Sequence, residues 1–382
     1  MKARLGDVCT VVSGSTPKST VPEYWDGDIK WITPAELSND TYIINDSARH
    51  ITALGVAKTG LKSFPAGTVI LSSRAPIGKT AIAGCEMFCN QGFKNLICSE
   101  KIDSKYLYYF LSGKTDYLNS LGRGATFKEI SKTIVENIEI PLPEIEEQKR
   151  IAARFERLLR LMQLQKAELE ELDKLVKSRF IELFGDPLSN DKGWKKVVIA
   201  EVCHAIFGGG TPSKSHPEYF AGSIPWVSPK DMKSSVINDS IDHITEEAIA
   251  HSTTNLVPAN SVLMVIRSGI LKHSLPVAIN SLPVTINQDM KAFVPNETVK
   301  TAFLMHFFKA IENDVLAGVR GVTADNIDFK AFQKRTIIVP PLALQEQFAA
   351  FVEQTDKSKL AVQKGLQELE ILKKSLMQQY FG

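Results

Sequence analysis

The chain has 382 residues, 44% of them hydrophobic and 23% charged, a composition typical of a globular protein with roughly two or three domains. With 45 Lys and Arg against 43 Asp and Glu, the formal net charge is only +2, which excludes a strongly basic protein. No run of about 18 uncharged apolar residues occurs, and residues 1–7 lack the apolar segment of a signal peptide, so we expect a cytoplasmic protein with no membrane partner.

Residues 1–143 are predicted to form a domain that mixes α-helices and β-strands. The strand-like run 68–71 is followed by turn signals at 75–78, and residues 107–111 form a short helical pattern that would pack on the sheet. The proline-rich segment 141–143 then ends the domain, because proline cannot continue a strand ladder and suits the approach to a helix.

Residues 144–185 are predicted to form one long helix. Its apolar positions follow mostly three- and four-residue spacing, with Gln165 in one core position. They are Ile151, Phe155, Leu158, Met162, Leu169, Leu172, Val176 and Leu183. Roughly 40 helical residues span about 60 Å, which is too long for one domain to bury. We therefore expect this helix to pair with a second one.

Residues 186–342 are predicted to form a second α and β domain, with a strand at 261–266 and a helix at 303–308, and residues 343–382 a second long helix. Gly365 makes this second helix the weaker one. The order domain, helix, domain, helix predicts an antiparallel coiled coil with the domains at opposite ends, and it brings Gly382 back near Met1.

The two halves of the chain carry the same motifs in the same order, and the first matched pairs are 195 residues apart. The pairs are Thr16 and Thr211, Tyr24 and Tyr219, Trp31 and Trp226, His50 and His243, Arg74 and Arg267, Asn90 and Asn287, Arg123 and Arg320, Gln148 and Gln347, and Phe184 and Phe381. Such a long repeat excludes a solenoid of short repeats. We predict an α+β protein with two similar domains related by a pseudo-twofold axis.

Taken together, these motifs resemble the specificity subunits of type I restriction-modification enzymes over essentially the whole chain. The resemblance rests on the Gly-x-Thr-Pro-like turns, the Trp-x-Ser/Thr-Pro strands, the segments 73–78 and 90–94, the Glu-Gln helix starts and the Phe-Gly helix ends. The second copy departs from this pattern at 267–269, where Arg-Ser-Gly replaces the longer turn, and at 287–290, where Asn-Gln-Asp-Met replaces Asn-Gln-Gly-Phe.

The resemblance implies two target-recognition domains, each of which reads one half of a bipartite sequence in double-stranded DNA. It also implies that the helices act as a spacer and dock two methyltransferase (M) subunits, which are S-adenosylmethionine-dependent and modify adenine N6. ATP-driven restriction (R) subunits would join them for cleavage. The chain itself would then be a non-catalytic recognition subunit that holds no cofactor.

Residues that both halves share cannot distinguish two different half-sites, so we expect them to contact the DNA backbone or stabilise the fold, while divergent loops read the bases. Arg and Lys bring charge and several donors to phosphate oxygens, and Thr adds a neutral donor. The predicted DNA-binding residues are Thr16, Lys18, Arg74, Lys79, Lys94, Arg123 and Thr126 in the first domain, and Thr211, Lys214, Arg267, Lys272, Lys291, Arg320 and Thr323 in the second. The alternative for each cation is a surface charge or a local ion pair.

Other shared residues are predicted to be structural. Trp31, Trp226, Tyr24 and Tyr219 are expected in the cores rather than as platforms for bases. The histidine pair His50 and His243 has no partner at metal-ligand spacing. The five cysteines are odd in number and contain no C-x-x-C pair, so we expect reduced, mostly buried thiols and no metal site.

Enzymatic motifs are incomplete in this sequence. Residues 78–80 read Gly-Lys-Thr, but the first glycine of a phosphate-binding loop is replaced by Ser73, and the second copy keeps only Lys272. We therefore predict no catalytic residue. Two alternatives remain open: an unrecognised methyltransferase or nuclease site within the chain, or a coiled-coil scaffold whose end domains bind protein or sugar.

Overall fold

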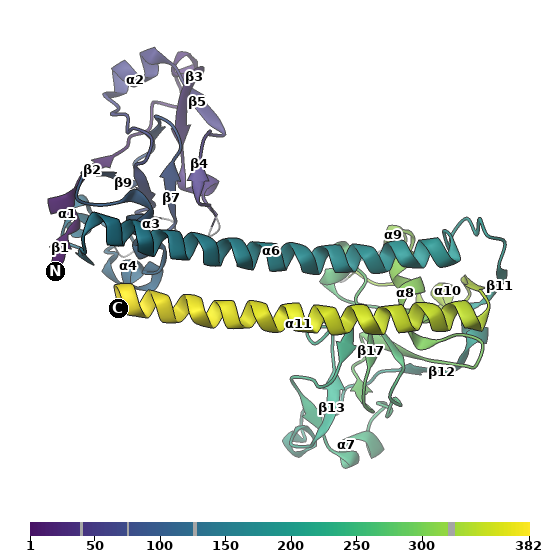
Figure 1. Cartoon of the computed structure of the whole chain (residues 1–382). Coiled ribbons are helices and arrows are strands. Elements are labelled where there is room, and N and C mark those ends of the chain that lie inside the picture. Colours follow the sequence, from purple (N-terminus) through teal and green to yellow (C-terminus); the bar gives the residue numbers. More distant parts are fainter. Residues whose placement is uncertain (39–40, 75, 125–127, 320–324) are drawn as a thin grey trace. The chain divides into compact units, whose positions relative to one another are not determined.

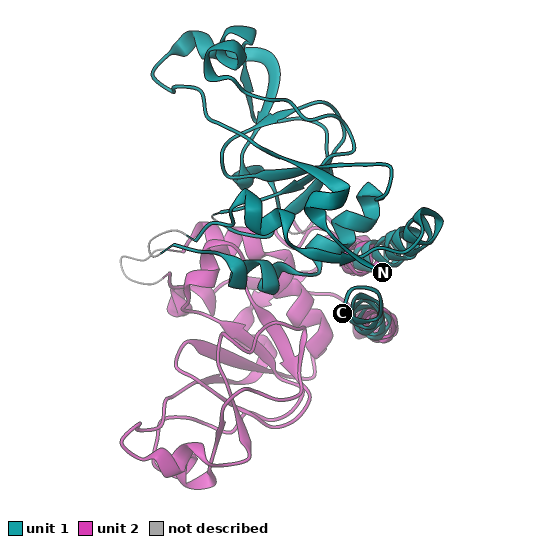
Figure 2. Ribbon diagram, turned by 90° about the vertical axis from the view of Figure 1, so that its left-hand side faces the viewer, with its two compact units in different colours: residues 1–166, 364–382 teal, residues 167–363 magenta. Residues whose placement is uncertain are grey.

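The computed structural model describes residues 1–38, 41–74, 76–124, 128–319 and 325–382, and its contacts divide the chain into two compact units (Figures 1 and 2). Unit 1 comprises Met1–Lys166 and Lys364–Gly382, and unit 2 comprises Ala167–Gln363. Each unit therefore contains one of the predicted domains together with part of both long helices.

The strands that the structure describes in unit 1 form three sheets. A five-stranded sheet has the order β2 (Cys9–Ser13), β9 (Lys94–Cys98), β6 (Val69–Leu71), β7 (Thr80–Ala83) and β4 (Ile43–Ile44). A three-stranded sheet has the order β5 (Arg49–Ile51), β3 (Trp25–Ile32) and β8 (Phe88–Cys89), and β1 (Lys2–Arg4) pairs with β10 (Glu139–Pro141). Neighbouring strands run antiparallel except β4 with β7 and β3 with β8.

The shorter α-helices in the described residues of unit 1 are α1 (Leu5–Val8), α2 (Ala53–Thr59), α3 (Ser104–Ser112), α4 (Thr115–Leu121) and α5 (Lys132–Glu136). Helix α3 begins where the Asp103 side chain accepts a hydrogen bond from the backbone N of Tyr106 at 2.9 Å, which satisfies a free donor of its first turn. The helix packs on β6 and β7, and its residues 106–111 are all buried. The predicted strand at 68–71 and the predicted helix at 107–111 are thus confirmed.

Unit 2 repeats this topology strand for strand. Its five-stranded sheet has the order β12 (Cys203–Gly208), β19 (Met290–Pro295), β16 (Val262–Val265), β17 (Val277–Asn280) and β14 (Val236–Ile237). The smaller sheets are β15 (His243–Ile244), β13 (Ile224–Val227) and β18 (Thr285–Ile286), and β11 (Lys195–Val198) with β20 (Thr336–Val339). The helices are α7 (Glu246–Ala250), α8 (Thr301–Ala310), α9 (Glu312–Ala317) and α10 (Phe329–Phe332).

The long helices are α6 (Ile145–Phe184) and α11 (Leu342–Phe381), each of 40 residues. They run antiparallel within each unit (Figure 1). In unit 1 the Phe155 and Phe381 rings lie 5.8 Å apart, and a Cβ on Gly365 would come within 2.7 Å of the Gln165 amide nitrogen. In unit 2 Phe180 packs on Phe348 and the Lys359 ammonium binds Asp173 at 2.6 Å. Lys2 and Gly382 line one hollow of unit 1, so the chain ends lie close together as expected.

The start of each long helix is held by a buried glutamine. The Gln148 amide accepts from the backbone N of Asp103 and donates to the carbonyls of Lys101 and Pro143, all at 2.9 Å. Gln345 makes the same three bonds in unit 2, to Lys300, Thr298 and Pro340. The predicted pairing of Gln148 with Gln347 is therefore wrong by two residues. The two equivalent glutamines each occupy the fourth position of their helix, from which the side chain reaches back to the preceding loop.

The cysteines and the shared aromatic residues follow the predictions in part. All five thiols are free, but only Cys9 and Cys89 are buried, and the other three are half-buried. Burial raises the pKa of Cys89 and of Cys203 to about 12, which keeps both thiols protonated. Trp31 and Tyr219 are core residues as predicted, whereas their counterparts Trp226 and Tyr24 are only half-buried.

One half-buried histidine makes the stability of unit 2 depend on pH. The pKa of His306, whose ring packs against Phe348, is lowered to about 3 by burial and then by the charges of Lys309 and Lys359. Its unfolded value is about 6.5. Between these pH values His306 binds a proton only in the unfolded chain. Its contribution to the free energy of unfolding is therefore fully present above about pH 6.5 and is lost as the pH falls.

We expect this histidine to cost unit 2 about 1 kcal/mol when the pH is lowered from 7.0 to 5.5. The variant His306→Phe should lose less stability than the wild type over this range, as measured by urea unfolding at each pH. His273→Phe, at an exposed histidine of the same unit, serves as the control. Equal losses in the wild type and in His306→Phe would contradict the assignment.

Candidate nucleic-acid interface

Most of the predicted DNA-binding residues gather in one group of loops in each unit. We call loop cluster 1 the described residues of 14–18, 72–79, 90–94 and 123–130, and loop cluster 2 the described residues of 209–214, 266–272, 287–291 and 325–327. In cluster 1 the backbone N of Ser73 bonds the carbonyl of Gly92 at 2.7 Å, and that of Ile130 bonds the carbonyl of Ser73 at 2.9 Å. The turn after β6 therefore lies between the segment 90–94 and the described part of the segment 123–130.

An indole and a threonine fix the first loop of each cluster. The indole N–H of Trp31 donates to the carbonyl of Ser15 at 3.0 Å, and that of Trp226 donates to the carbonyl of Gly210 at 3.0 Å. The predicted residues Thr16 and Thr211 each donate a hydroxyl hydrogen bond to the glutamine of the Asn-Gln segment, Gln91 and Gln288 respectively. Both threonines thus already have a partner within the protein, and both glutamines were missed at the sequence level although the repeat contains them.

Glycine is required at the base of these loops because the backbone passes very close to the neighbouring segment. A Cβ on Gly14 would lie 2.0 Å from the carbonyl oxygen of Cys89, and a Cβ on Gly209 would lie 1.8 Å from that of Asn287. No side chain fits at such distances, so any other residue would push the first loop away from the Asn-Gln segment. The two glycines therefore set the shape of both clusters.

The cations of loop cluster 1 differ in what they contact. The Lys94 ammonium is buried and bonds Glu129 at 3.0 Å and the Ser73 hydroxyl at 3.3 Å. Arg123 is exposed, and its backbone pairs with that of Glu129. Arg74 is half-buried, and its backbone also pairs with that of Glu129. Its guanidinium has no bonding partner among the residues that the structure describes. Of these three cations, Arg74 and Arg123 are therefore the ones available to a ligand.

Loop cluster 2 distributes its charges in the opposite way. Here the arginine is paired, because Arg267 Nε donates to Asp289 Oδ1 at 2.6 Å. The lysine Lys291, which occupies the place of Lys94, has no carboxylate partner in the described part of the chain and lies 4.8 Å above the ring of Phe329. Position 326, the counterpart of Glu129, is Asn326. Of the pairs Arg74/Arg267 and Lys94/Lys291, each cluster thus neutralises one cation with a carboxylate and leaves the other without one, and the two clusters differ in which.

The remaining predicted lysines of the two clusters either contact another residue or are exposed. Lys79 donates to the carbonyl of Leu37, and Lys272 lies 3.9 Å from Asp325. Lys18 and Lys214 are exposed. The predictions for Thr126, Arg320 and Thr323 fall outside the described residues. The histidines His50 and His243 each contact an aspartate four residues earlier, Asp46 at 3.2 Å and Asp239 at 2.7 Å, so this local pair is also repeated.

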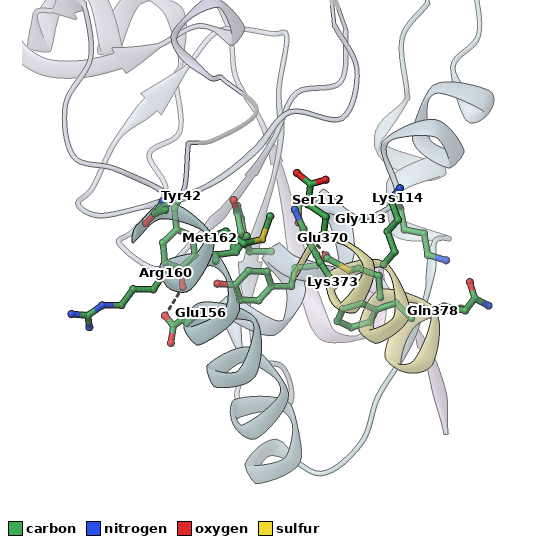
Figure 3. Close-up of a pocket in the computed structure, with 18 of the residues that line it drawn as sticks. Tyr42, Ser112, Gly113, Lys114, Glu156, Arg160, Met162, Glu370, Lys373 and Gln378 are labelled. Carbon is green, nitrogen blue, oxygen red and sulfur yellow. Dashed lines mark hydrogen bonds between the residues drawn. The ribbon is translucent and has the colours of Figure 1, made fainter. Parts of the chain in front are cut away.

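A cavity of about 940 Å³ lies elsewhere in unit 1, where α3, α6 and α11 meet (Figure 3). Tyr42 donates to Glu156 at 2.7 Å across its wall, and Arg160 and Lys373 lie at its rim. None of the predicted DNA-binding residues lines it. Unit 2 has Lys309 and Lys359 at the positions of Ser112 and Met162, so the lining is not repeated. The cavity is therefore separate from the loop clusters.

The described residues contain no group of three or more His, Cys, Asp or Glu side chains that could hold a metal ion. None of their helices is both long enough and apolar enough to cross a membrane.

Comparison with known proteins decides the family. The family model described as the type I restriction modification DNA specificity domain matches the chain twice, over residues 1–174 and 191–371. The chain belongs to this specificity-domain family. Both matches begin near the start of a domain and continue into the long helix that follows, so the duplication seen in the sequence is a duplication of the specificity domain.

Individual relatives agree with this membership. The chain is 30% identical over 396 residues to the type I restriction enzyme MjaIX specificity subunit of Methanocaldococcus jannaschii, covering 98% of this chain and 90% of the relative. It is 34% identical over 279 residues to the EcoR124I/EcoR124II specificity subunit of Escherichia coli, covering 71% and 68%. The chain thus spans most of the length of these specificity subunits.

Solved structures share the fold of this specificity-domain protein. A chain from a structure of type I restriction-modification complex assembly aligns with a TM-score of 0.65 at 19% identity and covers 100% of this chain and 97% of its own. The type I specificity subunit of M. genitalium aligns with a TM-score of 0.60 at 16% identity and covers 100% and 96%. At these identities the likeness establishes the fold alone.

Proposed function

We propose that this chain is the non-catalytic recognition subunit of a type I restriction-modification complex and that each of its domains binds one half of a bipartite sequence in double-stranded DNA. In this proposal α6 and α11, which both run through the two units, act as the spacer between the half-sites. The same helices dock two methyltransferase subunits, and restriction subunits join for cleavage. Two readers at a fixed separation require a fixed distance between half-sites.

The observation that carries the proposal is the duplicated loop cluster within a chain of this family. Each cluster places cations, backbone N–H groups and amide side chains on loops that rigid strands position, as a surface for phosphates and base edges requires. The net charge of +2 is compatible with basic patches that are local, whereas a uniformly basic protein would carry a much larger positive charge. In this proposal shared cations such as Arg74 contact the DNA backbone, while the divergent loops read the bases.

The proposal is tested by co-expressing the chain with the methyltransferase encoded beside it and mapping N6-methyladenine in the host DNA by single-molecule sequencing. The expected result is one bipartite motif with a fixed spacer, of which one side changes when residues 186–342 are exchanged for those of a relative. Methyl transfer by the purified chain alone would instead favour a catalytic site within it. A stable protein that neither forms this complex nor binds duplex DNA would favour the scaffold alternative.

Arg74→Ala should weaken binding of the complex to DNA on the order of tenfold, by a similar factor for cognate and unrelated duplexes. The physical reason is the loss of one phosphate contact, which also lowers the slope of log affinity against log salt by about 1. Binding is measured by fluorescence anisotropy at several salt concentrations.

Lys101→Ala, at an exposed cation outside loop cluster 1, is the matched control and should leave both the affinity and the slope unchanged. A changed target sequence at unchanged affinity would contradict the role of Arg74 in phosphate binding.

A further inference from the structure

Arg74 and Arg267 occupy the same place in the two loop clusters but differ in two neighbours. The backbone of each pairs with the equivalent residue of the following loop, Glu129 for Arg74 and Asn326 for Arg267. Arg267 Nε also donates to Asp289 at 2.6 Å, and the position of Asp289 in unit 1 is taken by Gly92. The guanidinium at this position therefore binds a carboxylate in the second domain, whereas in the first domain it has no carboxylate partner among the described residues.

The carboxylate that holds Arg267 is itself fixed. Its second oxygen, Oδ2, accepts from the Asn287 amide at 3.2 Å, while the backbone N of Asp289 donates to Asn287 Oδ1 at 3.1 Å. The backbone N of Arg267 donates to the carbonyl of Asp289 at 3.2 Å, so the two residues are joined through main chain and side chain. Asp289 is more enclosed than Arg267, with side chains 23% and 48% exposed.

This contact uses only the inner nitrogen of the guanidinium. Neither Nη1 nor Nη2 of Arg267 has a bonding partner among the residues that the structure describes. The guanidinium is planar, so an arginine anchored at Nε presents its two outer nitrogens side by side in a fixed plane. Two parallel donors match the O6 and N7 acceptors of guanine in the major groove, and this pairing is the commonest specific contact between arginine and DNA.

We propose that Arg267, oriented by Asp289, reads a guanine in the half-site bound by the second domain. This inference rests on the proposed function of the chain as a DNA recognition subunit. A carboxylate beside a phosphate contact would oppose binding, because it repels the DNA and cancels the charge that phosphate attracts. A carboxylate beside a base-reading arginine is useful, because orientation rather than net charge decides a bidentate contact.

The first domain has no room for the same arrangement. A Cβ on Gly92 would lie 2.8 Å from Cγ of Pro34 and 2.9 Å from Asn90 Oδ1, so an aspartate there would require the neighbouring segment to move. The acidic residue of loop cluster 1 is instead Glu129, which pairs with Lys94. Arg74 therefore remains a contact to the DNA backbone. Its counterpart Arg267 takes a different role because its neighbour Asp289 differs between the two halves.

The test maps the methylation motifs of complexes that contain the wild-type chain, Arg267→Lys, Asp289→Asn or Arg74→Ala. Arg267→Lys keeps the charge but loses the two parallel donors, so one guanine of one half-site should become degenerate, with discrimination falling roughly 5- to 150-fold. Asp289→Asn keeps the shape and should relax the same position. Arg74→Ala should lower methylation evenly and leave the motif unchanged.

A second measurement uses the wild-type complex and does not depend on whether a variant folds. Each guanine of the half-site altered by exchange of residues 186–342 is replaced in turn by 7-deazaguanine, which lacks the N7 acceptor. Binding should fall about tenfold at one position and little at the others. Equal effects at all positions, or a half-site without guanine, would overturn the inference.

Failure of the inference can be told apart from failure of the proposed function. If the wild-type complex yields a bipartite motif and Arg267→Lys changes only the affinity, Arg267 is a phosphate contact. If Arg267→Lys changes neither motif nor affinity, its ion pair with Asp289 is only structural. If the wild-type complex yields no motif, the proposed function fails, and the inference fails with it.

Discussion

Phe184→Ala should destabilise unit 2 by about 3–5 kcal/mol. Phe184 ends α6, is fully buried, and packs on Phe303, Phe180 and Phe348 with ring centroids 4.8, 5.0 and 5.5 Å away. Removing the ring leaves a cavity between α6, α8 and α11 that the rigid neighbours cannot fill. Hydrogen exchange read out by mass spectrometry should show faster opening throughout residues 167–363.

The matched control for this substitution lies one turn earlier on the same helix. Ile181 is 46% exposed, so Ile181→Ala removes apolar atoms from the helix without opening a cavity and should change stability by no more than about 0.5 kcal/mol. Similar losses for Phe184→Ala and Ile181→Ala would show that the end of α6 does not belong to the core of unit 2.

Gln148→Ala should cost unit 1 about 3 kcal/mol or more, although the residue is polar. The side chain is fully buried and satisfies three backbone groups, at Asp103, Lys101 and Pro143. Each buried backbone group left without a partner costs about 1–3 kcal/mol. Gln148→Glu should not rescue the loss at neutral pH, because a carboxylate accepts one of these bonds but cannot donate the other two. Urea unfolding measures both variants.

Two further substitutions make the test of Gln148 specific. Gln163→Ala, at an exposed glutamine of the same helix, should be close to neutral. Gln345→Ala should produce a loss of the same size, and hydrogen exchange should locate it in unit 2 rather than in unit 1. Small losses for both Gln148→Ala and Gln345→Ala would mean that water replaces the amide at the start of these helices.

The fold could be predicted from the sequence wherever a pattern repeats. The spacing of apolar residues placed both long helices to within one or two residues, and the paired motifs predicted two domains of one topology. The predicted counterpart of Gln148 was wrong, because the dipeptide Glu-Gln at residues 147–148 occurs again at residues 346–347 and makes Gln347 look like the match. The structural counterpart is Gln345, since a hydrogen-bonding role depends on position in the helix rather than on the neighbouring residue.

The loop clusters were less predictable, because the partners of a charge are set by tertiary contacts. Glu129 lies 35 positions after Lys94, and nothing local links the two residues in the sequence. The one available signal was the departure at residues 287–290, where Asp289 replaces glycine. From the sequence, that difference indicated only a change of loop shape. The structure shows that Asp289 forms an ion pair with Arg267.

The division of the chain into units has a consequence for folding during synthesis. Unit 1 consists of two segments of the chain, and the 197 residues of unit 2 lie between them. At 5–20 residues per second the ribosome needs roughly 10–40 s to make the intervening stretch. During that time Tyr106, Phe110 and Phe155 lack the Phe381 ring that covers them in the finished protein. The first domain to be made is therefore the last to close, and its exposed aromatic face is the surface that the nascent chain must protect from aggregation until the final turn of α11 emerges.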